Sequence, residues 1–164
     1  MAFRFTEDGE FRGQVSFTDL VPSPGAISNS HVSSTAAIAS SKLEQRNRQV
    51  YAQESNTAVA DGIYVIHVAG AAGTIESVSA GCVVAPVGNN STVSVDLLIN
   101  GNSALNSAIS ITESQAAREL VAGVLSTTTF NANAVIELSI DGEAGGGTLG
   151  KGLFSVLDIR ENAP

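Results

Sequence analysis

A glycine-rich run that ends in lysine is the stretch of this sequence most similar to a chemical site. Residues 145–151, GGGTLGK, match the first part of a phosphate-binding P-loop. The match fails at Gly152, where a Ser or Thr hydroxyl should hold magnesium, and the chain continues into LFSVLDI, which is typical of a strand. Without a helix N-terminus, an anion site lacks the helix dipole and a row of free N–H groups. We therefore interpret the run as a loop between two strands.

The histidines and the single cysteine lack partners at useful spacing. His31 lies in a serine-rich segment and His67 in the apolar run IYVIHV, and neither has a carboxylate or second histidine at metal-ligand spacing. We interpret His67 as a packed or edge-facing residue, with metal binding as the alternative. Cys82 falls on an apolar strand face, where a thiol behaves as a small hydrophobe. No Gly-x-Ser-x-Gly elbow presents a serine nucleophile. We expect no catalytic residue, no cofactor and no metal.

Four carboxylates near the C-terminus raise the question of a paired-acid site. Glu137, Asp141, Glu143 and Asp158 are spaced so that they could line one sheet face. A glycosidase pair and a solvated face are the two interpretations. We favour the solvated face, because the chain has no Trp and only 2 Tyr to form an aromatic platform for sugars.

Charge and composition exclude several classes of partner. The 164 residues include 8 basic and 16 acidic side chains, a net charge of −8, so we expect no nucleic-acid partner. There is no run of about 18 apolar residues and no apolar signal region near the N-terminus, so we expect no membrane span and no secretion signal. A single Cys fits assembly in a reducing cytosol.

Residues 92–111 contain the strongest local signal, Asn100-Gly101 between two runs of alternating apolar residues. This pattern predicts a β-hairpin. A two-residue turn would pair odd positions with even ones and place Val95 opposite Asn106, whereas an odd-length loop pairs apolar residues with each other. We therefore expect an odd-length loop in which Gly101 is a left-handed bulge residue.

Further short runs of the same kind predict an all-β body. Strands are expected at residues 63–69, 74–84, 120–125, 134–141 and 152–160, which with the hairpin make seven after residue 60. Residues 11–20 are compatible with an eighth strand, and residues 113–118 with one helical turn. Many short strands without intervening helices predict an antiparallel β-sandwich, and eight strands suit a jelly roll. The expected division is an N-terminal arm, residues 1–61, and a β-sandwich body, residues 62–164.

The expected arm differs from the body in composition. Four of the six Phe lie in it, and the Ser/Ala/Thr-rich residues 25–41 cannot bury much apolar area alone. It is either an arm that docks on a neighbour or a leader that stays flexible or packs on its own body. Residues 42–51, KLEQRNRQVY, are either a solvated edge strand or a contact for an acidic partner. The candidate partner contacts are Phe3, Phe5, Phe11, Phe17, Leu20, Lys42, Arg46 and Arg48.

Four blocks of the chain are similar to a known family. They are LEQRNRQVYAQ, IYVIHVAGAAGTIESVSAGCV, STVSVDLLINGNSALNSAISI and AVIELSIDGEAGGGTLGKGLFSVLDIRENAP, of which VDLLINGNSAL and GGGTLGKGLF are the most recognisable parts. They resemble small β-sandwich virion proteins of tailed bacteriophages, over roughly residues 42–164. The resemblance implies a jelly-roll-like body on the capsid exterior, commonly trimeric, as a decoration, cement or head-fibre subunit. It also implies an N-terminal arm that contacts the major capsid protein.

We therefore expect a structural virion protein, not an enzyme, made in the host cytoplasm and placed on the capsid exterior as a homotrimer. It would decorate and cement a tailed-phage capsid through its arm and β-body. The alternative is a receptor- or glycan-binding tip of a head or tail fibre, with residues 100–103 or 141–150 as binding loops. The first function predicts that removal of residues 1–41 abolishes capsid attachment, and the second predicts a bound host glycan.

Overall fold

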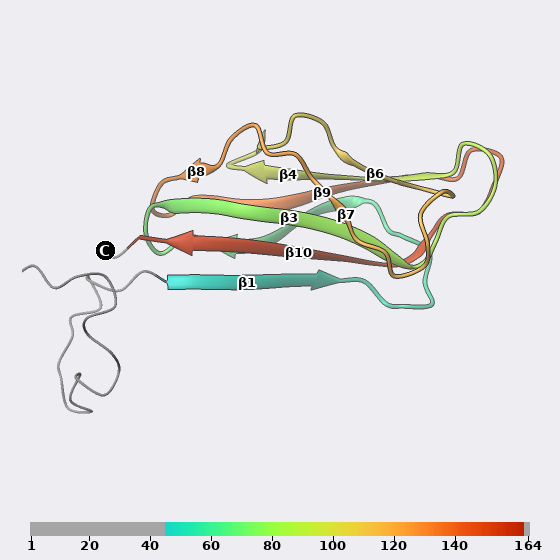
Figure 1. Ribbon diagram of the computed structural model, residues 1–164, viewed down its shortest axis with the longest axis horizontal. Coiled ribbons are helices and arrows are strands. Elements are labelled where there is room, and N and C mark those ends of the chain that lie inside the picture. Colours follow the sequence, from blue (N-terminus) through green and yellow to red (C-terminus); the bar gives the residue numbers. More distant parts are fainter. Residues whose placement is uncertain (1–44, 163–164) are drawn as a thin grey trace, which may run out of the picture. The chain divides into compact units, whose positions relative to one another are not determined.

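The computed structural model describes residues 45–162, which form two antiparallel β-sheets packed face to face (Figure 1). Sheet A contains, in spatial order, β1 (Gln45–Ala52), β10 (Lys151–Glu161), β3 (Gly73–Val84) and β7 (Val121–Ala122), and β8 (Thr129–Phe130) also pairs with β3. Sheet B contains β2 (Gly62–Val68), β9 (Val135–Glu143) and β4 (Thr92–Ile99), with β5 (Asn102–Ser103) and β6 (Ile109–Thr112) both paired with β4. Within the described residues, no helix has the length and apolarity needed to cross a membrane.

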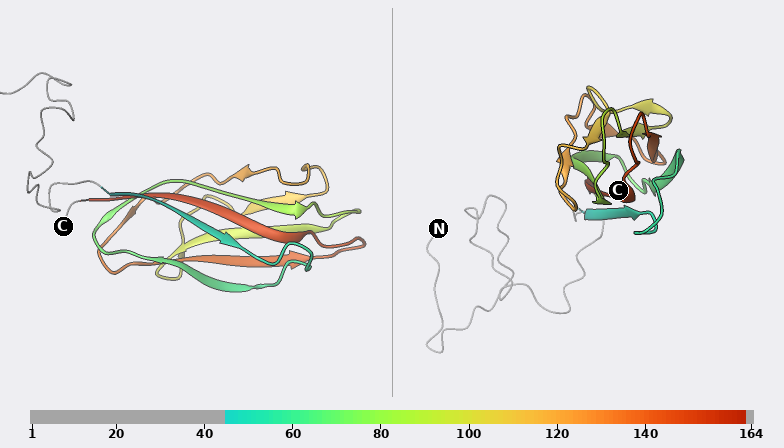
Figure 2. Two further views of the ribbon diagram at one scale, coloured as in Figure 1. Left: turned by 90° about the horizontal axis from the view of Figure 1, so that it is seen from below. Right: turned by 90° about the vertical axis from the view of Figure 1, so that its right-hand side faces the viewer.

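The strand order is that of a jelly roll. The chain crosses between the sheets repeatedly, which gives β1-β10-β3-β7 in one sheet and β2-β9-β4-β6 in the other (Figure 2). The predicted antiparallel sandwich is therefore confirmed. The eight strands of this order include β1, which belongs to the segment that the sequence analysis assigned to the arm. The sandwich therefore begins before residue 62. Residues 11–20, the other candidate for an eighth strand, lie outside the described residues.

Alternation along the strands builds the core between the sheets. Val93, Val95 and Leu97 of β4 are fully buried, and Ile136 and Leu138 of β9 lie directly beside this row. Each inward residue is followed by one that is partly or fully exposed, as the period of a strand requires. The inward side predicted for residues 134–141 is thus confirmed.

The hairpin loop differs from the prediction. Ile99 pairs with Asn102, so the loop has only two residues, Asn100 and Gly101, with φ of 51° and 78°. Two positive φ values are typical of a type I′ turn, which Asn-Gly favours. The odd-with-odd pairing is recovered later, because the chain leaves the ladder after β5 and returns with Ile109 opposite Val95. The expectation of an odd-length loop was therefore wrong.

Two other local expectations are corrected. Residues 113–118 form turns and no helix, although the side-chain oxygen of Gln115 does accept the N–H of Thr112 at 2.7 Å. The strand expected at residues 120–125 is reduced to the two residues of β7. Both segments lie where the chain crosses from sheet B to sheet A, and few ladder hydrogen bonds are available there.

Each sheet contains one β-bulge that changes where a polar side chain points. In β3, Ser77 pairs with Asp158 and Ile75 with the next residue of β10, so Glu76 has no partner in the ladder. In β2, Val65 pairs with Glu137 and His67 with Ile136, so Ile66 is the extra residue. Bulges re-aim side chains in this way. Glu76 is thereby exposed on the outer face of sheet A, whereas His67 is opposite a fully buried residue.

Candidate functional site

The outer face of sheet A carries Arg46 and Arg48, two of the residues singled out from the sequence. In β1 the even-numbered residues are exposed, and the odd-numbered residues from Asn47 onward are partly buried. Tyr51, for example, packs against the core. The described part of this window, residues 45–51, is an edge strand of sheet A, as one of the two interpretations expected, and the contact with an acidic partner stays a prediction.

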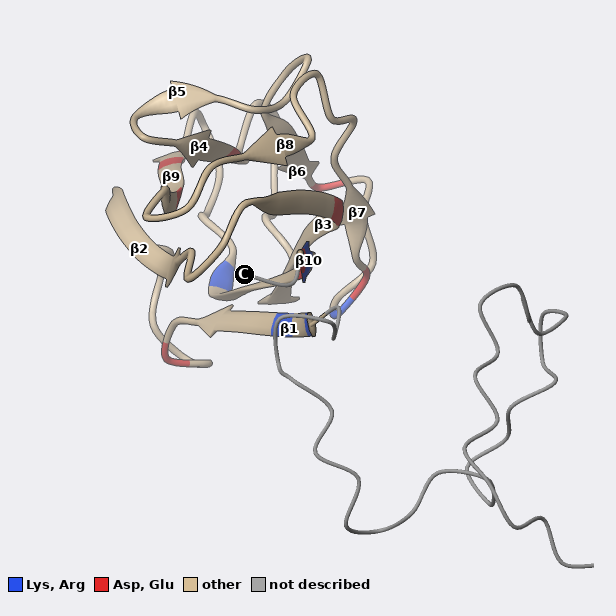
Figure 3. Ribbon diagram, turned by 90° about the vertical axis from the view of Figure 1, so that its left-hand side faces the viewer, with Lys and Arg blue, Asp and Glu red and all other residues tan. Residues whose placement is uncertain are grey.

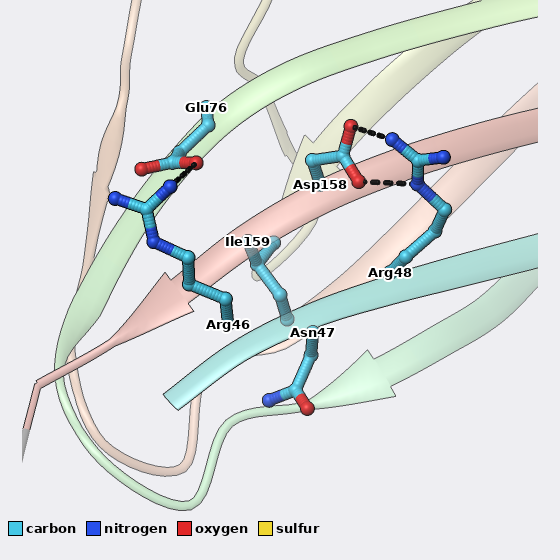
Figure 4. A pocket seen from close by; sticks show the side chains of 6 residues that line it. All are labelled: Arg46, Asn47, Arg48, Glu76, Asp158 and Ile159. Atoms are coloured by element: carbon cyan, nitrogen blue, oxygen red, sulfur yellow. Dashed lines mark hydrogen bonds and ion pairs between the residues drawn. The ribbon is translucent and has the colours of Figure 1, made fainter. Parts of the chain in front are cut away.

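Arg48 forms a two-point contact with a carboxylate on the neighbouring strand. The register of β1 and β10 places it opposite Asp158, to which Nε and Nη2 donate at 2.7 and 3.0 Å (Figure 4). The hydroxyl of Ser77 on β3 donates to the same carboxylate at 3.0 Å. The hydrogen bond from Arg48 holds the pKa of Asp158 below its usual value, against the smaller opposing effect of desolvation. The same hydrogen bond raises the pKa of Arg48.

Glu76 joins two further arginines because of the bulge in β3. Its carboxylate lies 3.7 Å from Nη1 of Arg46 and 3.5 Å from Nε of Arg160. A hollow of about 260 Å³ separates this group from the Arg48 pair (Figure 4). Its lining consists of Arg46, Asn47, Arg48, Glu76, Asp158 and Ile159.

This surface is suited to recognition by charge and hydrogen bonding. The hollow is lined by arginines that face carboxylates of the same sheet, and the nearby hydroxyls of Ser77 and Thr74 are used by Asp158 and Arg160. Within residues 45–162, no group of three or more His, Cys, Asp or Glu residues is arranged to hold a metal ion. The guanidinium of Arg48, which bonds Asp158 through Nε and Nη2, has further N–H groups for a partner, since an arginine side chain carries five.

The outer face of sheet B has a different character. Ile63, Val65 and Val68 of the edge strand β2 are 62%, 59% and 57% exposed. Val65 lies opposite Glu137 of β9, which in turn lies opposite Leu98 of β4. No strand of sheet B contains Lys or Arg, and Figure 3 marks the acidic positions of β9 in red on the ribbon.

The four carboxylates considered together in the sequence do not share a face. Glu137, Asp141 and Glu143 belong to β9 in sheet B, whereas Asp158 belongs to β10 in sheet A. The expectation that they line one face was wrong, because β9 and β10 are consecutive in the chain but lie in opposite sheets.

His67 connects the two sheets. Its Nε2 lies 2.9 Å from Oε1 of Glu161, the last residue of β10, and the same oxygen accepts the N–H of Gly70 at 3.0 Å. Both side chains are largely buried. Further along the two edge strands, the rings of Tyr51 and Tyr64 lie 4.9 Å apart, so side chains of β1 and β2 meet on this side of the sandwich. The interpretation of His67 as a packed residue is confirmed.

Cys82 is buried in the fold, and the glycine-rich run is hydrogen-bonded to a neighbouring turn. Burial raises the pKa of the Cys82 thiol to about 11, so the reactive thiolate is scarce at neutral pH. The loop after β9 leads directly into strand β10, as predicted. The N–H of Thr148 donates to Val87 O at 2.7 Å, and Val87 N donates to Thr148 O at 3.0 Å, so this part of the loop is bonded to the neighbouring turn.

The remaining predicted contact residues lie outside the described part of the chain. They are Phe3, Phe5, Phe11, Phe17, Leu20 and Lys42. Sequence reasoning missed the exposed apolar row on β2. Its signal was the run GIYVIHV, in which apolar residues occupy both faces of one strand, so that one set had to be exposed at a sheet surface.

No protein-family model matches the chain, and no curated protein matches it. Among solved structures, the chain is similar to one in "Acidic stable capsid structure of Helicobacter pylori bacteriophage KHP30". The two are 16% identical with a TM-score of 0.41, over 71% of this chain and 93% of that one.

Proposed function

We propose that this chain is a structural virion protein that decorates and cements a tailed-phage capsid from its exterior. The observation that supports this most is the jelly-roll order of the two sheets, which agrees with the fold implied by the family-like blocks of residues 42–164. In this proposal the partner is the major capsid protein, and the chain is a homotrimer.

The segment before β1 provides the main capsid contact in this proposal. It carries Phe3, Phe5, Phe11, Phe17, Leu20 and Lys42, and aromatic anchors dominate the energetics of protein interfaces. Many copies on one particle would make modest contacts effective through avidity. Arg46 and Arg48 extend the same contact onto sheet A, and the exposed guanidinium of Arg48 has N–H donors beyond the two that bond Asp158 for a carboxylate of the capsid.

The test compares the full-length chain with a variant in which Phe3, Phe5, Phe11 and Phe17 are all changed to Ser. Each is incubated with capsids assembled from the major capsid protein of the same phage, and co-sedimentation is measured. We expect the variant to stay in the supernatant while its far-ultraviolet circular dichroism still shows the β-sandwich. The matched control changes two exposed apolar residues of the body, Val87 and Val124, to Ser, which should leave sedimentation unchanged.

Equal sedimentation of the wild-type chain and the four-Phe variant would contradict the proposed contact. Failure of the wild-type chain to bind capsids, together with a hit on a host-glycan array, would favour the fibre-tip function instead.

A further inference from the structure

The two sheets carry opposite charge. The strands of sheet A contain Arg46, Arg48, Lys151 and Arg160 against Glu76, Asp158 and Glu161, which gives 4 − 3 = +1. The strands of sheet B contain Asp96, Glu137, Asp141 and Glu143 and no basic residue, which gives 0 − 4 = −4. Two sheet B faces would therefore repel each other, whereas a sheet B face and a sheet A face are complementary.

Each outer face also exposes apolar side chains beside its charge. On sheet A, Val50 is 66% exposed, lies opposite the partly exposed Val156, and is two residues from Arg48 on the same face of β1. On sheet B, Val65 and Leu98 flank Glu137 in one row across three strands. Both surfaces thus combine a short apolar row with one or more charges, the pattern expected of a partner-binding patch.

The position of the two patches allows one copy to use both at once. They lie on the outer faces of opposite sheets, and both include the edge strand at the side where Tyr51 of β1 meets Tyr64 of β2. Different patches that complement each other make a head-to-tail contact, which closes into a ring when the rotation between copies allows it and otherwise continues as an open chain of copies.

We propose that the chain self-associates head to tail through these patches. The Arg48, Val50 and Val156 surface of one copy contacts the Val65, Leu98 and Glu137 surface of the next. The occupant of each patch is therefore a second copy of this chain. This inference deepens the self-association included in the proposed function, and it does not require capsid binding.

Sedimentation velocity of the full-length chain over a range of concentrations tests the contact. Val50→Glu adds a negative charge to the first surface, and Val65→Lys adds a positive charge opposite Glu137 on the second. We expect each single variant to self-associate at least about tenfold more weakly than wild type. The double variant should regain self-association, because the two new charges attract each other across the contact. Val87→Lys is the matched control, since Val87 is 63% exposed but lies in the loop between β3 and β4.

Cross-linking provides a second measurement that does not depend on charge. A mixture of Val50→Cys and Val65→Cys chains should form a heterodimer with a short bis-maleimide, whereas neither chain alone should cross-link at that cysteine. The native Cys82 is buried and should not compete.

A wild-type chain that is monomeric throughout, variants that associate like wild type, or cross-links within a single variant would each overturn the inference. Capsid co-sedimentation is measured separately with the same proteins. A monomeric chain that still binds capsids would overturn head-to-tail association, and the proposed homotrimer with it, and would leave the proposed capsid binding standing.

Discussion

The bulge in β3 and the bulge in β2 each leave one residue without a ladder partner, but they turn polar side chains in opposite directions. The first exposes Glu76 beside Arg46 and Arg160 on the outer face of sheet A. The second turns His67 inward, where it meets Glu161. The same backbone irregularity therefore produces an exposed charged surface in one sheet and a buried connection between sheets in the other.

The two environments give these contacts different energetic weight. Exposed ion pairs contribute little to stability, because water and salt screen them and long side chains lose entropy. A buried polar contact is different, since removal of one partner leaves the other desolvated without a hydrogen bond. The β2 bulge should therefore matter for folding, and the β3 bulge for the surface that the protein presents to other molecules.

The largest effect is expected at the buried contact. Glu161→Ala should lower the free energy of unfolding by about 2 kcal/mol, because the largely buried His67 loses its partner and the N–H of Gly70 also loses a hydrogen bond. Urea denaturation followed by circular dichroism measures this. Glu161→Gln is the matched control and should lose less than half as much, since its amide oxygen can still accept the Gly70 N–H. Equal unfolding midpoints for Glu161→Ala and wild type would contradict the comparison.

His67→Ala should have a somewhat smaller effect, about 1–2 kcal/mol, because the N–H of Gly70 keeps its bond to Glu161. The double variant with Glu161→Ala should be less destabilised than the sum of the two single changes, since both remove the same contact. Unfolding free energies from the same urea titrations measure the coupling. Strict additivity would show that the two side chains do not act together.

The contact between Arg48 and Asp158 should show its effect through pH. The pKa of Asp158 is lower in the folded state than in the unfolded chain. Asp158 therefore stabilises the folded state at pH values above its unfolded pKa of about 3.9. That stability is lost as the pH falls below this value and through the lowered folded pKa. The urea midpoint of Asp158→Asn should therefore lie slightly below wild type at neutral pH, and the gap should narrow in acid. A gap that stays constant with pH would contradict the assignment.

The smallest effect is expected at the β3 bulge itself. Glu76→Gln should change the free energy of unfolding by no more than roughly 0.5 kcal/mol, since the ion pairs with Arg46 and Arg160 are partly exposed. Added salt should reduce even that difference, because screening weakens exposed pairs. Urea midpoints at low and high salt provide the measurement. A loss as large as that of Glu161→Ala would remove the distinction between the two bulges.

The fold could be predicted from alternation, because burial between two sheets imposes a period of two on every strand. Ile136 and Leu138 are inward for this reason. The bulges could not be predicted, because an extra residue is defined only against the partner strand. The hairpin shows the same limit. Its two-residue turn follows from Asn100-Gly101, but the return to apolar pairing depends on Leu105 leaving the ladder to bridge with Leu125 of a later segment.

Only half of the candidate site could be predicted from the sequence. Arg46 and Arg48 stood out as the basic window of the sequence. Their carboxylates did not, because Arg48 and Asp158 are separated by 110 residues and become neighbours only through the register of β1 on β10. Asp158 was grouped instead with the acids of β9, which are nearer in sequence but belong to the other sheet.

The position of β10 between β1 and β3 has a consequence for synthesis on the ribosome. The strand that completes the centre of sheet A is the last one to be translated, so β1 and β3 have no common neighbour until residues 151–161 emerge. Pairing across so long a stretch of chain is slow to form. A chain that has not yet been translated through β10 therefore lacks Asp158 and cannot present the assembled Arg48 surface.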